Sequence, residues 1–178
     1  MLVLGVDPGL SRCGYALMRS AKRGKGQVVS MGLIKTEKTH STPSRLATLH
    51  DDFEDLLKEF QPDALAIERI FFQKNLNTAL GVVQACGVIQ ALSYRRGLRV
   101  AEYSPTEIKS VVAGDGAADK EQIQFMVAKL LNLAEAPKPA DVADACAIAL
   151  TYLALNPKEE AIVINDLPKP KNETKATT

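Results

Sequence analysis

Leu2-Val3-Leu4-Gly5-Val6-Asp7-Pro8-Gly9 is a short apolar run that ends at a carboxylate followed by a turn. Such a run predicts a buried strand. The strand is expected to end at Pro8-Gly9, because proline donates no hydrogen bond to a neighbouring strand and glycine permits a turn. Asp7 then stands at the tip of a core element, where an unpaired carboxylate is costly. Two interpretations of Asp7 stay open on this stretch alone: a functional acid, or an acid that caps the turn.

The size and composition of the chain are typical of one cytoplasmic globular domain. Its 178 residues can bury a real core. No apolar run approaches the length of a membrane span, and residues 2–6 are too short for a signal peptide, so we expect a cytoplasmic location. The net charge of +1 means that any nucleic-acid footprint must be local. Cys13, Cys86 and Cys146 lack metal-binding spacing, which favours reduced, mostly buried thiols.

Hydrophobic periodicity predicts an α/β fold over residues 1–156. Strands are expected at 2–6, 13–19, 27–35, 64–68 and 98–103, and helices at 43–60, 75–96, 105–113, 120–131 and 141–155. Short links make the first three strands an antiparallel meander, whereas helical crossovers make the fourth and fifth parallel to the first. We therefore expect a five-stranded mixed sheet flanked by helices on both faces. Residues 157–178 are polar and are predicted to form a disordered tail.

Three further acids are candidate partners of Asp7. Glu68 ends the fourth predicted strand, and ligand sites of open α/β sheets lie outside the carboxyl ends of strands. Asp141 and Asp144 are three residues apart in the last helix and share one face. For Asp141, capping of the helix N-terminus and a favourable interaction with the helix dipole are at least as good an explanation. Asp144 stands in an otherwise apolar helix, where a lone acid would be costly.

Four acids without a nearby histidine or cysteine pattern predict a site for a hard cation, with Mg²⁺ as the default. The carboxylates would repel one another without a metal ion. A site with two metal ions activates a water molecule and stabilises the leaving oxygen in phosphodiester hydrolysis. The acids therefore point to metal-dependent phosphodiester chemistry.

Four segments in collinear order resemble the RuvC-type Holliday-junction resolvases of the ribonuclease H-like superfamily. They are Asp7-Pro8-Gly9 followed by Gly14-Tyr15, then Glu68-Arg69-Ile70-Phe71, then Gly114-Asp115-Gly116-Ala117-Ala118-Asp119-Lys120, and finally Asp141-Val142-Ala143-Asp144-Ala145. The resemblance runs from about residue 1 to about residue 155. It implies a ribonuclease H-like fold and a homodimeric, magnesium-dependent endodeoxyribonuclease. Such enzymes cut two like-polarity strands of a four-way DNA junction symmetrically, in recombination and repair.

The resemblance also implies roles for individual residues. It places Asp7, Glu68, Asp141 and Asp144 on the catalytic metal ligands, with a pair of Mg²⁺ ions per subunit that Mn²⁺ can replace. Some members carry histidine at the position of Asp141. Many carry histidine where this chain has Tyr152, and we assign Tyr152 no role. The implied partners are four-way junction DNA, a second copy of the chain and the RuvA–RuvB branch-migration complex.

Aromatic and basic residues near the acids are candidates for DNA contact. Phe71 and Phe72 cannot both face one side of an extended segment, and an exposed ring next to the acids can stack on an unpaired base. The resemblance assigns stacking to Phe71, and we expect Phe72 to pack beneath the long helix. Lys109 and Lys120 match family lysines near the scissile phosphate, although a lone lysine is usually a solvated surface residue. Composition adds further candidates for phosphate contacts, namely Arg69, Lys74, Arg95, Arg96 and Arg99.

Two other functions remain as alternatives. The first is another ribonuclease H-like nuclease, acting on RNA–DNA hybrids or on ribosomal RNA precursors. The second is a nucleotide-binding fold of the actin or sugar-kinase kind, which requires two such domains where this chain has one. The small residues of the long helix, such as Gly81 and Gly87, are equally consistent with a dimer surface and with core packing.

Overall fold

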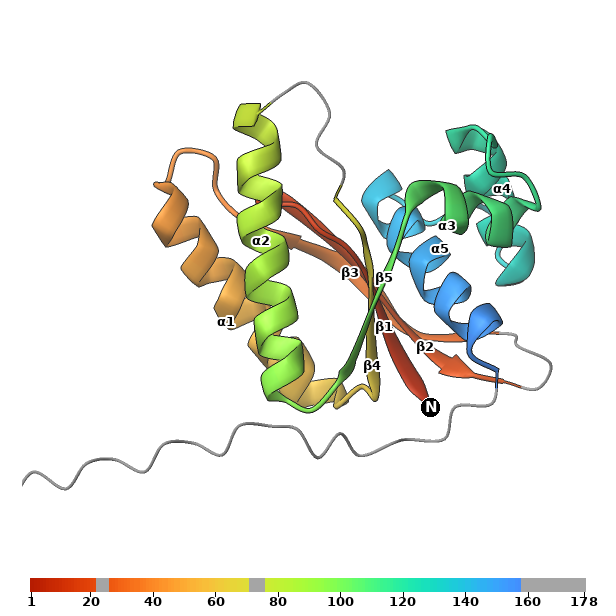
Figure 1. Ribbon diagram of the computed structural model, residues 1–178, viewed down its shortest axis with the longest axis horizontal. Coiled ribbons are helices and arrows are strands. Elements are labelled where there is room, and N and C mark those ends of the chain that lie inside the picture. The colour runs from red at the N-terminus through yellow and green to blue at the C-terminus, as the bar shows by residue number, and fades with distance from the viewer. Residues whose placement is uncertain (22–25, 71–75, 158–178) are drawn as a thin grey trace, which may run out of the picture.

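The computed structural model consists of a five-stranded sheet between two layers of helices (Figure 1). It describes residues 1–21, 26–70 and 76–157, without the side chains of residues 76–78. From residue 158 onward, the predicted tail lies outside the described residues. The strands are β1 (Leu2–Asp7), β2 (Arg12–Ser20), β3 (Gly26–Lys35), β4 (Ala64–Glu68) and β5 (Arg99–Tyr103). The helices are α1 (Thr42–Phe60), α2 (Leu76–Arg95), α3 (Pro105–Ala113), α4 (Lys120–Leu130) and α5 (Ala140–Leu155).

The strand order is β3-β2-β1-β4-β5. β1 pairs with β2, and β2 with β3, in antiparallel fashion, whereas β1 pairs with β4, and β4 with β5, in parallel. The predicted meander and the predicted parallel strands are therefore confirmed. The element boundaries differ from the predicted ones by about a residue, as is usual for helix and strand ends.

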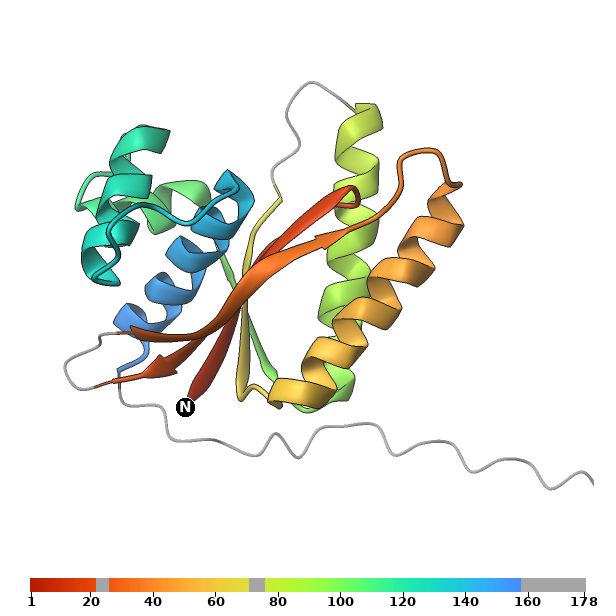
Figure 2. The same ribbon diagram turned by 180° about the vertical axis from the view of Figure 1, so that it is seen from behind.

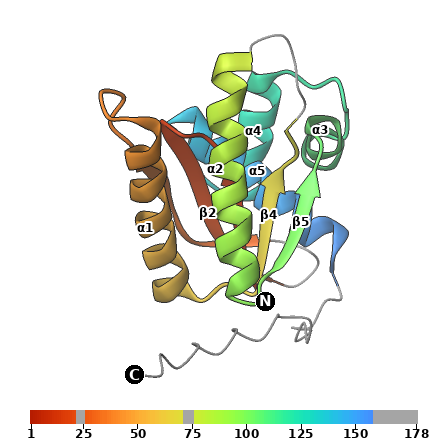
Figure 3. The ribbon, with the colours of Figure 1, turned by 60° about the vertical axis from the view of Figure 1, so that its left-hand side comes forward.

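Helices cover both faces of the sheet, as predicted. Figures 1 and 2 show α1 and α2 on one face and α3, α4 and α5 on the other, and Figure 3 looks onto the face that α1 and α2 cover. Alternate residues of β1 enter the two cores: Leu4 packs in the cluster that contains Phe53, and Val3 in the cluster that contains Ile148. This alternation follows from the two-residue repeat of a strand, and it makes β1 buried on both faces.

Small residues let α5 approach the sheet closely. A methyl group at Gly5 would lie 2.4 Å from the carbonyl oxygen of Ala145, and one at Gly14 would lie 2.1 Å from the carbonyl oxygen of Asp141. Neither position has room for a side chain. The glycines of β1 and β2 therefore seat the first turns of α5 directly against the strands.

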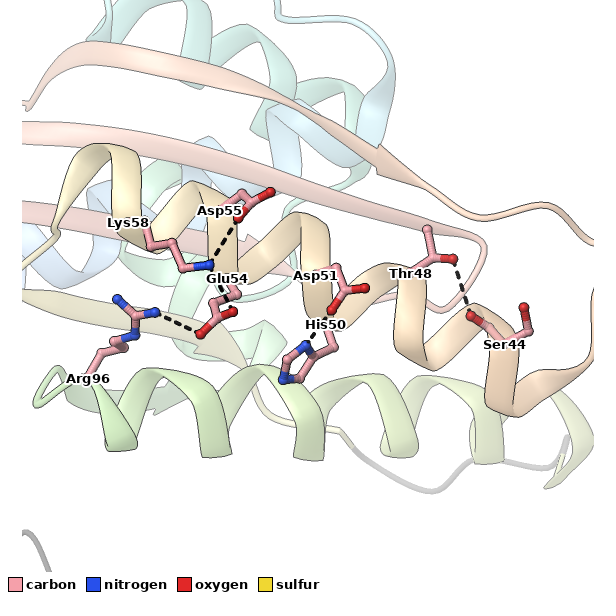
Figure 4. A network of polar contacts seen from close by, with 8 residues as sticks. All are labelled: Ser44, Thr48, His50, Asp51, Glu54, Asp55, Lys58 and Arg96. Carbon is pink, nitrogen blue, oxygen red and sulfur yellow. Dashed lines mark hydrogen bonds and ion pairs between the residues drawn. The ribbon is translucent and has the colours of Figure 1, made fainter. Parts of the chain in front are cut away.

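Ion pairs tie α1 to the end of α2 (Figure 4). Arg96 Nη2 donates to Glu54 Oε1 at 2.7 Å, and Lys58 Nζ lies 3.0 Å from Glu54 Oε2. The hydrogen bonds from Arg96 and Lys58 lower the pKa of Glu54 from its ordinary 4.5 to about 2. These contacts are solvent-exposed, so their contribution to the free energy of unfolding is small.

The pH dependence of this contribution can be predicted. A carboxyl group whose pKa is depressed on folding stabilises the folded state above its unfolded pKa, and this stabilisation is lost as the pH falls through the folded pKa. We expect Glu54→Gln to lower the melting temperature slightly at pH 7 and not at pH 2, measured by circular dichroism. An equal effect at both pH values would contradict the assignment.

Two further expectations concern the cysteines and the helices. Cys13, Cys86 and Cys146 are buried and form no disulfide, as predicted. Over the described ranges, no helix combines the length and the apolar character needed to cross a membrane.

Candidate active site

β1 and β4 place Asp7 and Glu68 side by side. The last paired residues of the two parallel strands are Val6 and Ile67, and each is followed directly by the acid that ends its strand. Asp7 and Glu68 border one pocket of about 360 Å³. The expected meeting of these two acids at the carboxyl ends of neighbouring strands is therefore confirmed.

α5 brings Asp141 and Asp144 to the same edge of the sheet, where its first turns pack against β1 and β2. Asp144 and Glu68 line a second pocket, of about 220 Å³. The negative charges of Asp144, Glu68 and Asp141 interact electrostatically with Asp7. The four predicted acids thus come together from three elements that are distant in the sequence.

The proximity of the acids changes their protonation. Burial, followed by the charges of Asp144, Glu68 and Asp141, raises the pKa of Asp7 from 3.8 to about 7, while Lys120 opposes the shift. Burial and the charge of Asp144 also raise the pKa of Glu68. Both acids therefore lie in a site that favours a bound cation over bare carboxylates.

Two predicted lysines reach this edge. Lys120 Nζ donates to Asp144 Oδ2 at 3.0 Å, and this hydrogen bond raises the pKa of Lys120. Lys120 is the first residue of α4, whose start is set by a reciprocal capping box between Asp119 and Gln122. Lys109 of α3 lines the same pocket as Glu68 and Asp144. The capping boxes that start α3, at Ser104, and α4, at Asp119, therefore help to position both lysines.

Arg12 is a residue of the site that sequence reasoning missed. Its Nε and Nη2 donate to Asp141 Oδ2 at 3.0 and 2.7 Å. Asp141 does not cap α5, because the N-cap residue is Pro139 and has no side-chain capping bond. The capping prediction for Asp141 is therefore wrong, whereas its place in the first turn of α5 agrees with the predicted favourable interaction with the helix dipole. No local pattern signals Arg12, because its partner is 129 residues away along the chain.

The other candidates for DNA contact lie in different parts of the structure. Arg69 directly follows Glu68, and its Nη2 donates to the carbonyl oxygen of Glu102 at 3.4 Å. Phe71, Phe72 and Lys74 lie outside the described residues. Three further arginines lie at the end of the sheet opposite the acids, at the end of α2 and the start of β5, and their phosphate contacts stay a prediction: Arg95, Arg96 and Arg99.

The donor set of the site suits a hard cation. It consists of carboxylates alone, and Mg²⁺ prefers oxygen ligands. In the part of the chain that the structure describes, no three His, Cys, Asp or Glu side chains already stand in positions that could hold a metal ion together. Asp141 and Asp144 are instead turned toward Arg12 and Lys120. The residues fit a metal by chemistry and location, and binding requires these two acids to exchange their ion-pair partners.

A mixed sheet in the order β3-β2-β1-β4-β5, with acids at the ends of β1 and β4 and on the crossing α5, defines a nuclease of the ribonuclease H-like class. Family comparison narrows this class. The family model described as crossover junction endodeoxyribonuclease RuvC matches residues 3–152, and the chain belongs to this family.

Individual relatives support the assignment. The crossover junction endodeoxyribonuclease RuvC of Frankia casuarinae is 43% identical, covering 88% of this chain and 91% of its own. The crossover junction endodeoxyribonuclease RuvC of Moorella thermoacetica is 45% identical, and the match covers 88% of this chain and 93% of that protein. The structure of T. thermophilus RuvC in complex with a Holliday junction substrate has a TM-score of 0.82 at 33% identity, with 87% of this chain and 94% of that chain covered. The predicted family and fold are confirmed.

Proposed function

We propose that this chain is a magnesium-dependent endonuclease that resolves four-way DNA junctions by cutting two strands of like polarity. One observation carries the proposal: four carboxylates converge at one edge of the sheet in a chain of the crossover junction endodeoxyribonuclease family. Phosphodiester hydrolysis needs metal-binding oxygens at a rigid site, and strand ends and a packed helix provide such a site here.

In this proposal Asp7, Glu68, Asp141 and Asp144 hold a pair of Mg²⁺ ions, which Mn²⁺ can replace. When bound, the ions supply an activated water and stabilise the leaving oxygen. Asp7 is the most central ligand, because it interacts with all three other acids.

The lysines of the site act on the phosphate. Lys120 is released from Asp144 when that acid takes a cation, and its ammonium group then lies beside the reacting phosphate. Lys109 lines the same pocket as Lys120 and Asp144. Positive charge at these two points stabilises the charge that develops on the phosphate oxygens during cleavage.

The proposal includes a homodimer that forms through α2. This helix exposes Leu80 and Tyr94, which are 60% and 41% exposed, and Gly87 and Ala91 are exposed on the same helix. A methyl group at Gly87 would meet nothing within 4 Å. Such a surface allows close approach of a second helix, and a two-fold dimer matches the two-fold symmetry of a four-way junction.

The test is a cleavage assay on a synthetic four-way junction, with linear duplex and RNA–DNA hybrid of the same sequence as matched substrates. We expect paired, symmetric nicks in the junction with Mg²⁺ or Mn²⁺, and none with EDTA. Gel mapping of each strand locates the nicks, and ligation checks their ends. Cleavage of the hybrid in preference to the junction would overturn the proposal.

A further inference from the structure

A pocket with a basic lining and no acidic one lies beside the acidic edge, on the other side of the turn that follows Asp7. Its volume is about 360 Å³, and its walls come from residues 9–12, the first turns of α1 and the amino-terminal half of α2. The side chains that can bind a ligand there are Ser11, Arg12, Thr42, Arg45 and Gln84. The lining residues include two guanidinium groups and no carboxylate. The charge of the pocket therefore suits an anion.

Arg45 is held in place by neutral groups. Its Nε donates to Thr36 Oγ1 at 3.0 Å, and its Nη2 donates to Ser11 Oγ. Thr36 is buried and its hydroxyl donates to the carbonyl oxygen of Leu10, so its oxygen is oriented to accept from Arg45. Within residues 1–21, 26–70 and 79–157, no carboxylate forms an ion pair with Arg45. The guanidinium is thus fixed while its charge stays uncompensated.

Arg12 connects the pocket to the acids. It lines the pocket and also donates both of its bonds to a single oxygen of Asp141. The side chain of Arg12 is 46% exposed, and an exposed ion pair of this kind contributes little to stability. Arg12 can therefore exchange Asp141 for another anion at low cost.

We propose that Arg12 and Arg45 form a binding site for a non-scissile phosphate of the DNA backbone. Guanidinium groups bind phosphate oxygens through paired, charge-assisted hydrogen bonds. Phosphate contacts of this type set the position of the nucleic acid on the protein. The pocket adjoins the acids. When the reacting phosphate of a DNA strand lies at Asp7, a neighbouring phosphate of the same strand lies in the pocket. This assignment of the source of the phosphate rests on the proposed function.

The test measures junction binding in the Asp7→Asn background, which prevents cleavage. Fluorescence anisotropy gives the Kd at several KCl concentrations for the parent, for Arg45→Ala and for Arg45→Lys. We expect Arg45→Ala to weaken binding about tenfold and to reduce the slope of log Kd against log salt concentration by about 0.9, the value for one phosphate contact. Arg45→Lys keeps the charge and should keep the slope.

Lys58→Ala is the matched control, because it removes a positive charge at the opposite end of the same helix. It should leave the Kd and the slope unchanged. An unchanged Kd and slope in a folded Arg45→Ala variant would overturn the pocket alone. If Arg45→Ala does not fold, Arg12→Lys and Arg12→Gln provide the same comparison of a kept and a removed charge. Failure of the parent to bind the junction would instead overturn the proposed function.

A second measurement separates DNA phosphate from a free anion. Inorganic phosphate is titrated against the melting temperature of the wild type and of Arg45→Ala. Phosphate could raise the melting temperature of the wild type but not of Arg45→Ala, while Arg45→Ala leaves the salt dependence of junction binding unchanged. These two results together would assign the pocket to a free anion and overturn the DNA assignment.

Discussion

Replacing Asp7 by asparagine is expected to abolish junction cleavage and to leave junction binding intact. Asp7 is the acid that interacts with all three other carboxylates, and an amide oxygen is a much weaker ligand for a cation. Loss of several kcal/mol of transition-state stabilisation corresponds to a rate decrease of about 10³-fold or more. Single-turnover cleavage and anisotropy binding measure the two effects separately. Asp55→Asn, an exposed acid on α1, is the control and should cut normally.

The same substitution is expected to stabilise the metal-free protein near neutral pH. The carboxyl group of Asp7 has a pKa of about 7 in the folded protein and an ordinary value of 3.8. Between these values the folded state binds a proton that the unfolded state has released, so the free energy of unfolding falls as the pH rises. Asparagine carries no such penalty. In EDTA, the stability gain of Asp7→Asn should grow from pH 4 to pH 7 and reach a few kcal/mol.

Two results would contradict this account of Asp7. Full cleavage by Asp7→Asn would show that Asp7 is not a required ligand. Equal stability of the wild type and Asp7→Asn in EDTA, at both pH 4 and pH 7, would show that the folded protein does not disfavour the ionised form of Asp7. Addition of Mg²⁺ should stabilise the wild type more than the variant, because a ligand that binds only the folded state raises its stability.

Gly14→Ala is expected to have the second largest effect, on stability and on activity together. A methyl group at this position would lie 2.1 Å from the carbonyl oxygen of Asp141, which is backbone and cannot rotate away. α5 must then move off β2. Overpacking of this kind costs about 1–3 kcal/mol. The movement also displaces Asp141, whose backbone packs over Gly14, and misplacement of a catalytic group by about 1 Å can reduce the rate about 100-fold.

Gly87→Ala is the matched control for this prediction. Gly87 lies in α2, where an added methyl group meets nothing within 4 Å. Alanine is preferred to glycine inside a helix, so this variant should be as stable as the wild type or more stable. Urea denaturation compares the three proteins. A Gly14→Ala variant with wild-type stability and wild-type cleavage would show that α5 does not need this close approach.

Much of the architecture could be predicted because local physics decides it. The apolar run of residues 2–6 produces a buried strand, and the Pro8-Gly9 turn ends the pairing of β1 close to Asp7. Capping boxes at Ser104 and Asp119 set the starts of α3 and α4, which agree with the predicted helix starts at residues 105 and 120. Helical crossovers make β4 and β5 parallel to β1, which brings Glu68 next to Asp7.

The electrostatic partners of the acids could not be predicted, because they come from contacts between distant segments. Arg12 and Asp141 meet only when α5 packs across β2. Composition likewise does not tell which end of the sheet a residue occupies, and Arg96 and Arg99 lie at the end opposite the acids.

For Asp7, the sequence by itself determined its place at the end of a core strand, because strand ends are decided by neighbouring residues. Glu68, Asp141 and Asp144 were candidate partners that the family resemblance grouped with it, and packing of β4 and α5 against β1 brings them together. Only the tertiary structure decided that Asp141 and Asp144 face Arg12 and Lys120, and that Arg45 stands in a pocket without a carboxylate. Charge pairing depends on distances across the sheet edge, and those distances exist only after α1, α2 and α5 have packed.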